Sequence, residues 1–401
     1  MSHLTETLKK NYNEALLDTQ GTFSNLNAEQ EACLSHLWKL LLPILEQNDR
    51  IDFVYSESTG YGKSDQPIVK KNKDILFSQK VGEVCEKNAL PPPSIKKSQT
   101  SFTSAFFTSF ATLHPDSVLL KFLRARKWNV DKALEMLQEA VVWRAQNNVA
   151  ELMWYGETNL NYRYIQKKAS FIAGSDRLGQ SVLYIEVNEV IPAQLSLKDL
   201  LKHTVHLMEV SMRNITLEHE KITIFIDVKN MSFKNFDWHF FKLFLKFLTD
   251  YYPESLALVL IYSSSWVFRS LWATIRMLLD PVVASKVHFA ESFEDVLSFI
   301  DKDQLIQRYG GDLQTEYYYV LPYPGENDKM YNTADAQKSI DNFQSAYTAF
   351  LDATSAWVAA DSNTTPTAKK HRDTCIQNLL NSAQHYENHH VAKNIYNRIQ
   401  K

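Results

Sequence analysis

Four basic side chains lie close together in the segment LLKFLRARKWNVDKALEML, residues 119–137. They precede the first acidic residue of the segment, Asp131, and they are Lys121, Arg124, Arg126 and Lys127. Guanidinium and ammonium groups can together hold a singly charged phosphodiester. The alternative is a solvated helix end, where positive charge interacts favourably with the C-terminal end of the helix dipole. The residues alone leave both interpretations open.

Known catalytic patterns are missing: the sequence has no GxSxG, HExxH or GxGxxG. Residues 62–64, GKS, resemble the end of a phosphate-binding loop, but Glu57 replaces its first glycine and no helix follows. The segment SSSW, residues 263–266, follows a strand of buried type, and helix capping by Ser264 or Ser265 is its simplest explanation. We therefore expect no catalytic residues, no cofactor and no enzyme activity.

Two histidine-containing pairs have the spacing of metal ligands on a helix. The pairs are His371 with Cys375 and His385 with His389, each four residues apart. Helix-surface histidines are usually solvated, and two helices would have to converge to bring both pairs to one ion. We predict that no metal site is present.

Composition limits the possible partners and location. The net charge of −3 and the pI near 6.5 argue against a nucleic-acid binder, which normally carries a basic excess. Cys33, Cys85 and Cys375 are widely spaced, as expected in a reducing compartment. The N-terminus has no apolar core of a secretory signal, and the longest apolar run, residues 256–262, is far shorter than the roughly 20 residues of a membrane span. We expect a cytoplasmic protein that touches membranes only from outside.

Short apolar runs alternate with helical patterns in the middle of the chain, which predicts an α/β fold with helices packed on a mixed sheet. Strands are expected at residues 168–174, 181–187, 222–228, 256–262 and 286–289, and helices at 196–217, 237–250 and 265–279. Before them, an amphipathic helix is predicted at 29–47, bent or interrupted at Pro43, and two helices at 116–147, separated at Trp128 and Asn129. Residues 326–401 are mostly helical by pattern, and Tyr347, Phe350 and Trp357 are expected to pack back on the main body.

The predicted helix at 265–279 has a wide apolar face with arginines beside it. Phe268, Leu271, Trp272 and Ile275 lie on that face. Such a helix either lies at a membrane surface or forms part of an ordinary core. The spacing of the residues does not decide between the two.

Five segments together resemble the CRAL-TRIO lipid-binding family in their order and spacing. They are LLKFLRARKWNVDKALEML, TIFIDVKNMSFKN, DYYPESLALVLI, LLDPVVASKVHF and RYGGDL, within residues 115–315. The chain is similar to fungal phosphatidylinositol transfer proteins of a divergent branch without dual specificity. The resemblance implies an α/β lipid-binding domain with an amphipathic gate helix, preceded by a small helical unit. The domains expected are a helical extension (1–55), a flexible linker (56–110), the CRAL-TRIO N-terminal helical domain (111–160), the lipid-binding domain (161–315) and a C-terminal helical extension (316–401).

The resemblance also implies roles for individual residues. The lipid headgroup would be held by Arg126, Lys127, Glu254 and Lys286. The gate helix would contact the membrane through Trp266, Phe268, Leu271, Trp272 and Ile275. Ile222 and Ile224 would line the pocket where dual-specificity members have Ser and Thr, which puts phosphatidylcholine exchange in doubt.

The function implied is the binding and transfer of phosphatidylinositol by a monomer. One phospholipid would be carried between cytosolic membrane surfaces, with transient peripheral contact to endomembranes, and presented to lipid kinases or other lipid enzymes. No nucleic-acid partner is expected. Two alternatives remain: a carrier of a neutral isoprenoid or sterol-like lipid, and a regulatory scaffold that transfers nothing and uses residues 326–401 as a partner surface.

Overall fold

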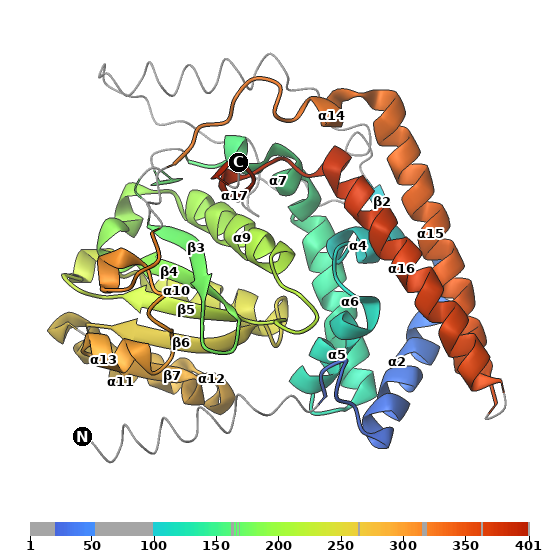
Figure 1. Ribbon diagram of the computed structural model, residues 1–401, viewed down its shortest axis with the longest axis horizontal. Helices are drawn as coiled ribbons and strands as arrows, with labels where there is room; N and C mark the ends of the chain where they lie inside the picture. The colour runs from blue at the N-terminus through green and yellow to red at the C-terminus, as the bar shows by residue number, and fades with distance from the viewer. Residues whose placement is uncertain are drawn as a thin grey trace. The chain divides into compact units, whose positions relative to one another are not determined.

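The computed structural model describes residues 21–52, 99–161, 164–165, 167, 169–263, 265–314, 319–361 and 364–399 (Figure 1). The GKS motif, Cys85 and most of the predicted linker lie outside these ranges. The chain divides into two compact units. The sheet unit contains the described residues of the range 163–319 together with 21–25, and the helical unit contains those of the ranges 26–162 and 320–401. Each unit is described by itself.

The sheet unit is built on five strands in the order β3-β4-β5-β6-β7 (Figure 1). The edge strand β3 is antiparallel to β4, and the other neighbours are parallel. All five strands lie within two residues of their predicted bounds, because each is a short apolar run flanked by turn residues. The strands are β3 (Ser170–Ser175), β4 (Ser181–Glu186), β5 (Ile222–Asp227), β6 (Leu256–Tyr262) and β7 (Val287–Ala290).

The helices between these strands confirm the predicted α/β alternation. Each of the three long ones begins at a side chain that accepts a hydrogen bond from the helix backbone: Ser196, Asp237 and Ser265. Ser265 accepts from the amide of Phe268 at 3.2 Å, which confirms the capping explanation for the SSSW segment. The helices of this unit are η2 (Val187–Glu189), η3 (Pro192–Gln194), α9 (Leu197–Arg213), η4 (Phe233–Asn235), α10 (Trp238–Asp250), α11 (Trp266–Leu278), α12 (Pro281–Ser285), α13 (Phe293–Leu297) and η5 (Gln307–Tyr309).

One face of the sheet is packed solid. Tyr184, Phe225, Leu258 and Leu260 point to this face from the three central strands, and none exposes any surface. Their partners come from α13 and from the segment 299–309 that follows it. Close packing of this kind gives the sheet a rigid side.

The helical unit gathers segments from both ends of the chain. Its elements are α2 (Ala28–Gln47), β1 (Arg50–Asp52), β2 (Gln99–Ser101), α4 (Phe102–Ser109), α5 (Pro115–Ala125), α6 (Val130–Gln146), α7 (Val149–Tyr155), η1 (Gly156–Asn159), α14 (Asp328–Tyr331), α15 (Thr333–Ala359), α16 (Thr365–His390) and α17 (Ile395–Ile399). The predicted separation of α5 from α6 at Trp128 and Asn129 is confirmed. Of the predicted bend or interruption at Pro43, the interruption is wrong: α2 continues through Pro43, and the nearby Leu42 and Leu45 are buried.

The predicted flexible linker, residues 56–110, is wrong for its last part. Residues 99–109 form β2 and α4. The preceding residues are rich in Ser and Lys, so the apolar run that follows them was included in the predicted linker. Phe102, Phe106 and Phe107 of this run are buried. Ser101 begins the helix by accepting a hydrogen bond from the amide of Ser104 at 3.2 Å.

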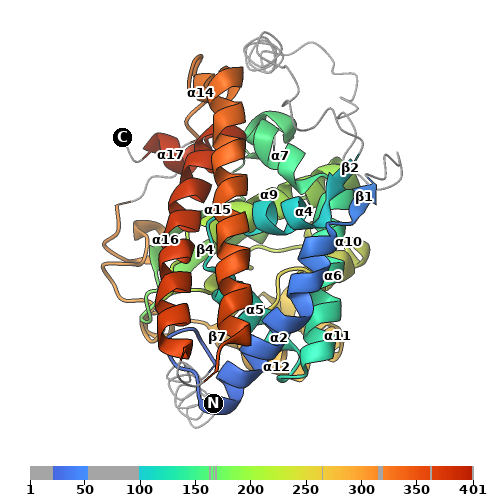
Figure 2. The same cartoon turned by 90° about the vertical axis from the view of Figure 1, so that its right-hand side faces the viewer.

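The two longest helices, α15 and α16, run side by side as a C-terminal pair, with α2 next to α15 (Figure 2). Phe350 of α15 is fully buried and meets the ring of Trp38 edge to face, with centroids 5.4 Å apart. Tyr347 stacks on Phe107 of α4 at 4.5 Å. The predicted packing of these two aromatic residues on the rest of the chain is confirmed within the helical unit.

Candidate functional site

The second face of the sheet is covered incompletely. We call the set Ile185, Ile226, Leu256, Val259 and Val287 the apolar floor; all five side chains lie on this face, and all are only partly buried. On the opposite face the central residues of the same strands are fully buried: Val182, Tyr184, Phe225, Leu258 and Leu260. A sheet normally buries its central apolar residues on both faces when helices cover both. The helices above the floor therefore leave apolar surface accessible in the middle of the sheet.

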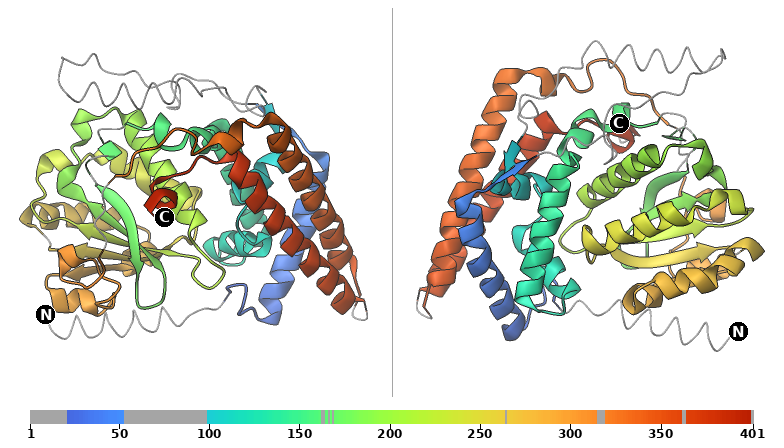
Figure 3. Two further views of the ribbon diagram at one scale, coloured as in Figure 1. Left: turned by 45° about the horizontal axis from the view of Figure 1, so that its top comes forward. Right: turned by 180° about the vertical axis from the view of Figure 1, so that it is seen from behind.

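The helix α10, which lies on the same face of the sheet as the apolar floor, is also incompletely packed. In Figure 3 (right) the helices α9, α10 and α11 lie across one face of the sheet. The sequence of α10, WHFFKLFLKFLTD, is rich in aromatic and leucine residues, yet Phe247 is the one residue of this helix that is buried. Large apolar residues that are half-buried along a whole helix indicate surface that lacks a close partner. The half-buried apolar residues of α10 are Trp238, Phe240, Phe241, Leu243, Phe244, Leu245 and Leu248.

The predicted gate helix, α11, turns most of its apolar face inward. Phe268 and Ile275 are buried in a cluster with Ile261 of the sheet, and Leu271 and Trp272 are partly buried against it. Of the five predicted membrane-contact residues, only Trp266 is exposed, at 72%. Phe268 and Ile275 are thus covered by the sheet, whereas Leu271 and Trp272 keep part of their surface accessible.

Sequence reasoning missed other exposed apolar residues around α11. Phe233 of η4 is 57% exposed and meets the Trp266 ring edge to face, with centroids 5.8 Å apart. Met277, near the other end of α11, is 77% exposed. Phe233 lies in a segment without periodic pattern, so nothing in its neighbourhood along the chain indicates that it adjoins the helix. No helix in the described ranges is long and apolar enough to cross a bilayer.

Two of the predicted headgroup residues, Glu254 and Lys286, lie at the edge of the sheet where the parallel strands begin. Lys286 ends α12 and donates from Nζ to the carbonyl oxygen of Leu256 at 2.8 Å. Glu254 lies two residues before Leu256 and has a left-handed backbone, with φ of 53°. Within the part of the chain that the structure describes, its half-buried carboxylate has no hydrogen-bond or ion-pair partner. The structure thus brings these two residues to one edge.

The other two predicted headgroup residues, Arg126 and Lys127, belong to the helical unit. Arg126 ends α5, and Lys127 follows in the left-handed conformation, with φ of 51°. This reversal directs the chain away from the helix axis, and the Lys127 side chain is exposed. Lys121 of the same basic cluster is instead buried. The four basic side chains therefore do not form a single surface patch, and the predicted headgroup residues divide two and two between the units.

The predicted pocket-lining residues, Ile222 and Ile224, are on the same face of the sheet as the apolar floor. They are 3% and 5% exposed and pack with Leu183 and with residues of α9, including Leu207 and Met212. This part of the face is therefore tightly packed. The accessible apolar surface lies beside it on β6, at Leu256 and Val259, the register partners of Ile222 and Ile224, and farther along β5 at Ile226.

A pair of carboxylates lies where the parallel strands end, and no motif in the sequence predicted it. Glu186 and Asp227 are register partners on β4 and β5. Arg308 donates to Glu186, and the Tyr309 hydroxyl donates to Asp227 at 3.1 Å. Burial raises the pKa of Glu186, Arg308 opposes this rise, and the nearby Asp227 adds to it. The pair fastens the segment around Arg308 to the sheet.

The histidine and cysteine pairs do not form a metal site. His371, Cys375, His385 and His389 all lie on α16, and not on two helices as expected. Cys375 and His385 are ten residues apart on one helix, which separates them by about 15 Å. One ion cannot bridge that distance. Among the described residues no group of three or more His, Cys, Asp or Glu side chains could hold a metal.

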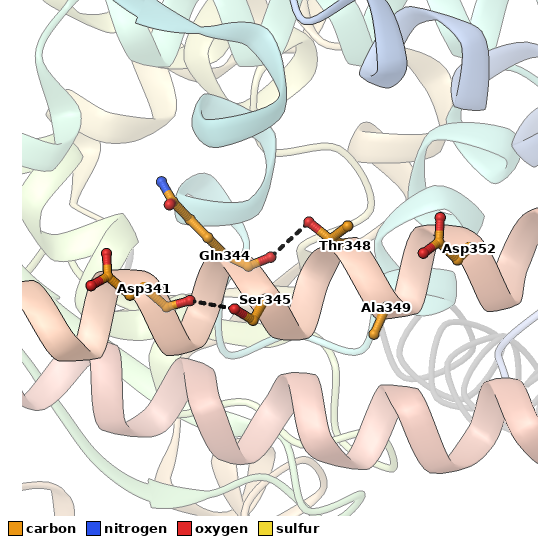
Figure 4. A pocket seen from close by; sticks show the side chains of 6 residues that line it. All are labelled: Asp341, Gln344, Ser345, Thr348, Ala349 and Asp352. Carbon is orange, nitrogen blue, oxygen red and sulfur yellow. Dashed lines mark hydrogen bonds between the residues drawn. The ribbon is translucent and has the colours of Figure 1, made fainter.

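A hollow also lies along α15 in the helical unit (Figure 4). All its lining residues come from that one helix: Asp341, Gln344, Ser345, Thr348, Ala349 and Asp352. Its lining side chains are mostly polar, with an acidic residue at each end, so the hollow does not suit hydrocarbon chains.

Comparison with protein-family models matches the CRAL/TRIO domain to residues 165–311 and the CRAL/TRIO N-terminal domain to residues 88–139. A CRAL-TRIO domain-containing protein of Schizosaccharomyces pombe is 29% identical over 292 residues, covering 71% of this chain and 65% of the relative. The phosphatidylinositol transfer protein CSR1 of Eremothecium gossypii is 24% identical over 269 residues, covering 64% of this chain and 61% of the relative.

A second CRAL-TRIO domain-containing protein of Schizosaccharomyces pombe is 31% identical over 244 residues, covering 58% of this chain and 68% of the relative. The chain thus spans less than two thirds of the length of the first two relatives. The crystal structure of Sfh5 aligns with 78% of this chain and 98% of its own, at a TM-score of 0.47 and 15% identity.

Proposed function

The chain belongs to the CRAL-TRIO domain family, and from this premise we propose that it binds phosphatidylinositol and carries one phospholipid at a time between membrane surfaces that face the cytosol. One of its relatives is a phosphatidylinositol transfer protein. A carrier has to surround the two acyl chains of the lipid with apolar surface, as the membrane does. These have on the order of 30 methylenes, so their exposure to water would cost roughly 25 kcal/mol at about 0.8 kcal/mol each.

The observation that carries the proposal is the contrast between the two faces of the sheet. One face has no exposed surface on Tyr184, Phe225, Leu258 or Leu260, whereas the apolar floor on the other face stays partly accessible beneath α9, α10 and α11. An accessible apolar surface inside a folded unit is costly unless it is used. Acyl chains lying between the floor and α10 would cover both.

The headgroup is proposed to lie at the edge where the strands begin. Lys286 donates from Nζ to the carbonyl oxygen of Leu256, which holds the ammonium group at this edge, where its positive charge can attract a phosphate. Glu254 can accept hydrogen bonds from inositol hydroxyls. Arg126 and Lys127 supply further positive charge for the phosphodiester. Phosphatidylcholine lacks the ring hydroxyls, and the buried Ile222 and Ile224 offer no polar group in their place.

The gate is proposed to be α11. Its exposed end, Trp266 with Phe233, makes the first contact with a bilayer. Opening moves Phe268 and Ile275 from the sheet into the lipid interface and uncovers the floor. No bond is made or broken in this cycle. Delivery to lipid kinases or other lipid enzymes follows from the same movement.

Mass spectrometry of lipids that co-purify with the full chain tests the proposal directly. Phosphatidylinositol is the expected species. Vesicle-to-vesicle transfer then tests the headgroup residues: Arg126→Ala combined with Lys286→Ala is expected to reduce phosphatidylinositol transfer at least tenfold. Two exposed ion-pair residues of the sheet unit, Arg177 and Lys302, provide a charge-matched control as Arg177→Ala with Lys302→Ala. Transfer that survives the first double substitution unchanged would refute the headgroup assignment.

A further inference from the structure

Glu254, the proposed acceptor for inositol hydroxyls, lies in a turn whose other residues are covered. Tyr252, Pro253 and Ser255 are buried, whereas Glu254 is half-buried. We call residues 252–255 the Glu254 turn. A turn that buries its own backbone and presents one carboxylate suits the binding of a ligand at that carboxylate.

The backbone of the Glu254 turn is strained at Glu254 itself. Its φ of 53° is left-handed, a conformation that glycine adopts freely and that a residue with a Cβ atom disfavours. Pro253 fixes the preceding φ near −65°, and a turn with proline second and a left-handed residue third usually has glycine in third place. Strain of this kind persists only where the surroundings hold the backbone, and it is characteristic of ligand-binding sites.

A buried carboxylate of α9 holds the turn on the side that precedes Glu254. The Tyr252 hydroxyl donates to Oε1 of Glu209 at 2.7 Å. Arg213 donates to Oε2 of the same carboxylate at 3.0 Å, so both of its oxygens are engaged. Glu209 is 1% exposed and Tyr252 is 5% exposed. Because a carboxylate paired with a guanidinium is a strong acceptor, Glu209 fixes the position of the Tyr252 ring.

The sheet holds the chain on the side that follows Glu254. The carbonyl oxygen of Ser255 accepts from the amide of Ile222 at 2.8 Å. The carbonyl oxygen of Leu256 accepts from Nζ of Lys286, also at 2.8 Å. The backbone is therefore fixed on both sides of the strained residue, once by a side chain of α9 and once by the sheet with Lys286.

An apolar contact would join α9 to the turn as well as this polar one. Met212, three residues on along α9, belongs to one apolar cluster with Ile222 and Leu256. Replacing a buried ion pair by apolar side chains is often neutral or stabilising, so stability alone does not explain the bond between Tyr252 and Glu209. What the bond adds is direction, because it fixes one atom of the turn at a set distance from α9.

We propose that Glu209 and Tyr252 are positioning residues of the headgroup site, which hold the Glu254 carboxylate where it accepts hydrogen bonds from the inositol ring. The inference rests on the proposed function, since it presupposes that Glu254 meets the ring hydroxyls. Both residues are buried, so they act through Glu254 and not on the lipid. The phosphate is attracted by positive charge instead. Loss of the positioning pair therefore impairs recognition of the ring and leaves recognition of the phosphate intact.

The test compares two anionic lipids that share a phosphodiester and differ in the alcohol attached to it. Phosphatidylinositol carries the inositol ring, and phosphatidylglycerol carries glycerol. Uptake of each lipid from phosphatidylcholine vesicles is measured for the full chain, for Tyr252→Phe, for Glu254→Gln and for the two combined. Tyr309→Phe is the matched control, because it also removes a buried hydroxyl that donates to a carboxylate of the sheet unit, Asp227. The melting temperature is recorded for every variant.

Tyr252→Phe is expected to lower the preference for phosphatidylinositol over phosphatidylglycerol about fivefold, with phosphatidylglycerol uptake unchanged. It should have no further effect in the Glu254→Gln variant, because the carboxylate that it positions is already lost. Glu209→Gln retains an acceptor for the Tyr252 hydroxyl and should keep most of the preference, whereas Glu209→Leu should lower it as Tyr252→Phe does. Should Glu209→Leu not fold, Tyr252→Phe, which removes a single oxygen, decides the question.

A purely structural role gives a different result. The inference is overturned if Tyr252→Phe lowers uptake of both lipids equally, if its effect is the same with and without Glu254→Gln, or if Tyr309→Phe lowers the preference as much. It is overturned alone if Glu254→Gln removes the preference and Tyr252→Phe leaves it intact. If Glu254→Gln leaves the preference intact, the headgroup role of Glu254 and the inference fail together. If the unaltered chain takes up neither lipid, the proposed function fails as well.

Discussion

Arg372 and Asp116 are 256 residues apart in the sequence and form a doubly hydrogen-bonded ion pair, with N–O distances of 2.5 and 2.7 Å. The guanidinium lies 4.5–5.5 Å from the ring centroids of Trp38, Phe350 and Trp357. Burial raises the pKa of Asp116, but Arg372 outweighs it and holds that pKa below its ordinary value. The pair therefore joins α16 to the first turn of α5.

Removal of Arg372 is expected to destabilise the helical unit strongly. Arg372→Met leaves the Asp116 carboxylate buried with no cation, at a cost of about 3–5 kcal/mol in the free energy of unfolding. Urea denaturation followed by tryptophan fluorescence measures this. Lys369→Met on the same helix removes an exposed ion pair with Glu31 and is expected to cost less than about 1 kcal/mol. Equal losses in the two variants would contradict a stabilising role for the buried pair.

Acidification is expected to weaken the helical unit through His390. Burial lowers the pKa of His390 to about 4, below the 6.5 of an exposed histidine, so the unfolded chain takes up a proton first. The free energy of unfolding should therefore fall as the pH drops from about 6.5 to 4, by about 3 kcal/mol for this group. Denaturation at pH 7 and pH 4.5 measures the fall. His390→Phe should make it smaller, whereas the exposed His371→Phe on the same helix should leave it unchanged.

Two substitutions in α11 are expected to have opposite consequences. Trp266→Ala removes an exposed ring, so it should weaken association with anionic vesicles severalfold and change the melting temperature little. Phe268→Ala removes a ring packed against the sheet, at a cost of about 3–5 kcal/mol in stability. Vesicle sedimentation and thermal unfolding of both variants distinguish the two effects. A vesicle-binding loss confined to Phe268→Ala would show that the helix meets the membrane only after opening.

Loss of Arg308 is expected to make the sheet unit sensitive to pH. Arg308→Met removes the group that keeps the pKa of the buried Glu186 from rising further. We expect a loss of about 1–3 kcal/mol at pH 7, where the carboxylate must stay charged. The loss should shrink as the pH falls toward 4.5, because a protonated Glu186 needs no cation. Arg177→Met, at an exposed pair with Asp301, is the control, and a loss at pH 7 that persists unchanged at pH 5 would argue against this linkage.

The sequence contained enough information for the elements of the sheet unit. The segment that became β5 is a short apolar run, and the one that became α11 has apolar residues every three to four positions; a turn residue or a capping serine marks their ends. Local patterns of this kind depend on neighbours along the chain. They predicted five strands and three long helices closely.

What the sequence could not supply was how completely each surface is covered. Ile185 and Tyr184 are adjacent apolar residues of one strand, yet one is partly accessible and the other is not. That difference depends on which helices lie over each face and how close they come. The contact of Glu186 with Arg308 spans 122 residues, including β5, β6 and β7, beyond the reach of any local pattern. For the same reason, Trp266 and Phe268 had the same predicted role but differ in exposure.

The helical unit is made of two separate stretches of the chain, which determines the order in which its parts become available during synthesis on the ribosome. Helices α2 to α7 are synthesised first, but their partners α15 and α16 follow only after the whole sheet unit. At 5–20 residues per second, those roughly 160 residues take about 10–30 s. Throughout that delay Trp38 and Asp116 lack Phe350 and Arg372, the side chains of the C-terminal helices that enclose them in the finished unit.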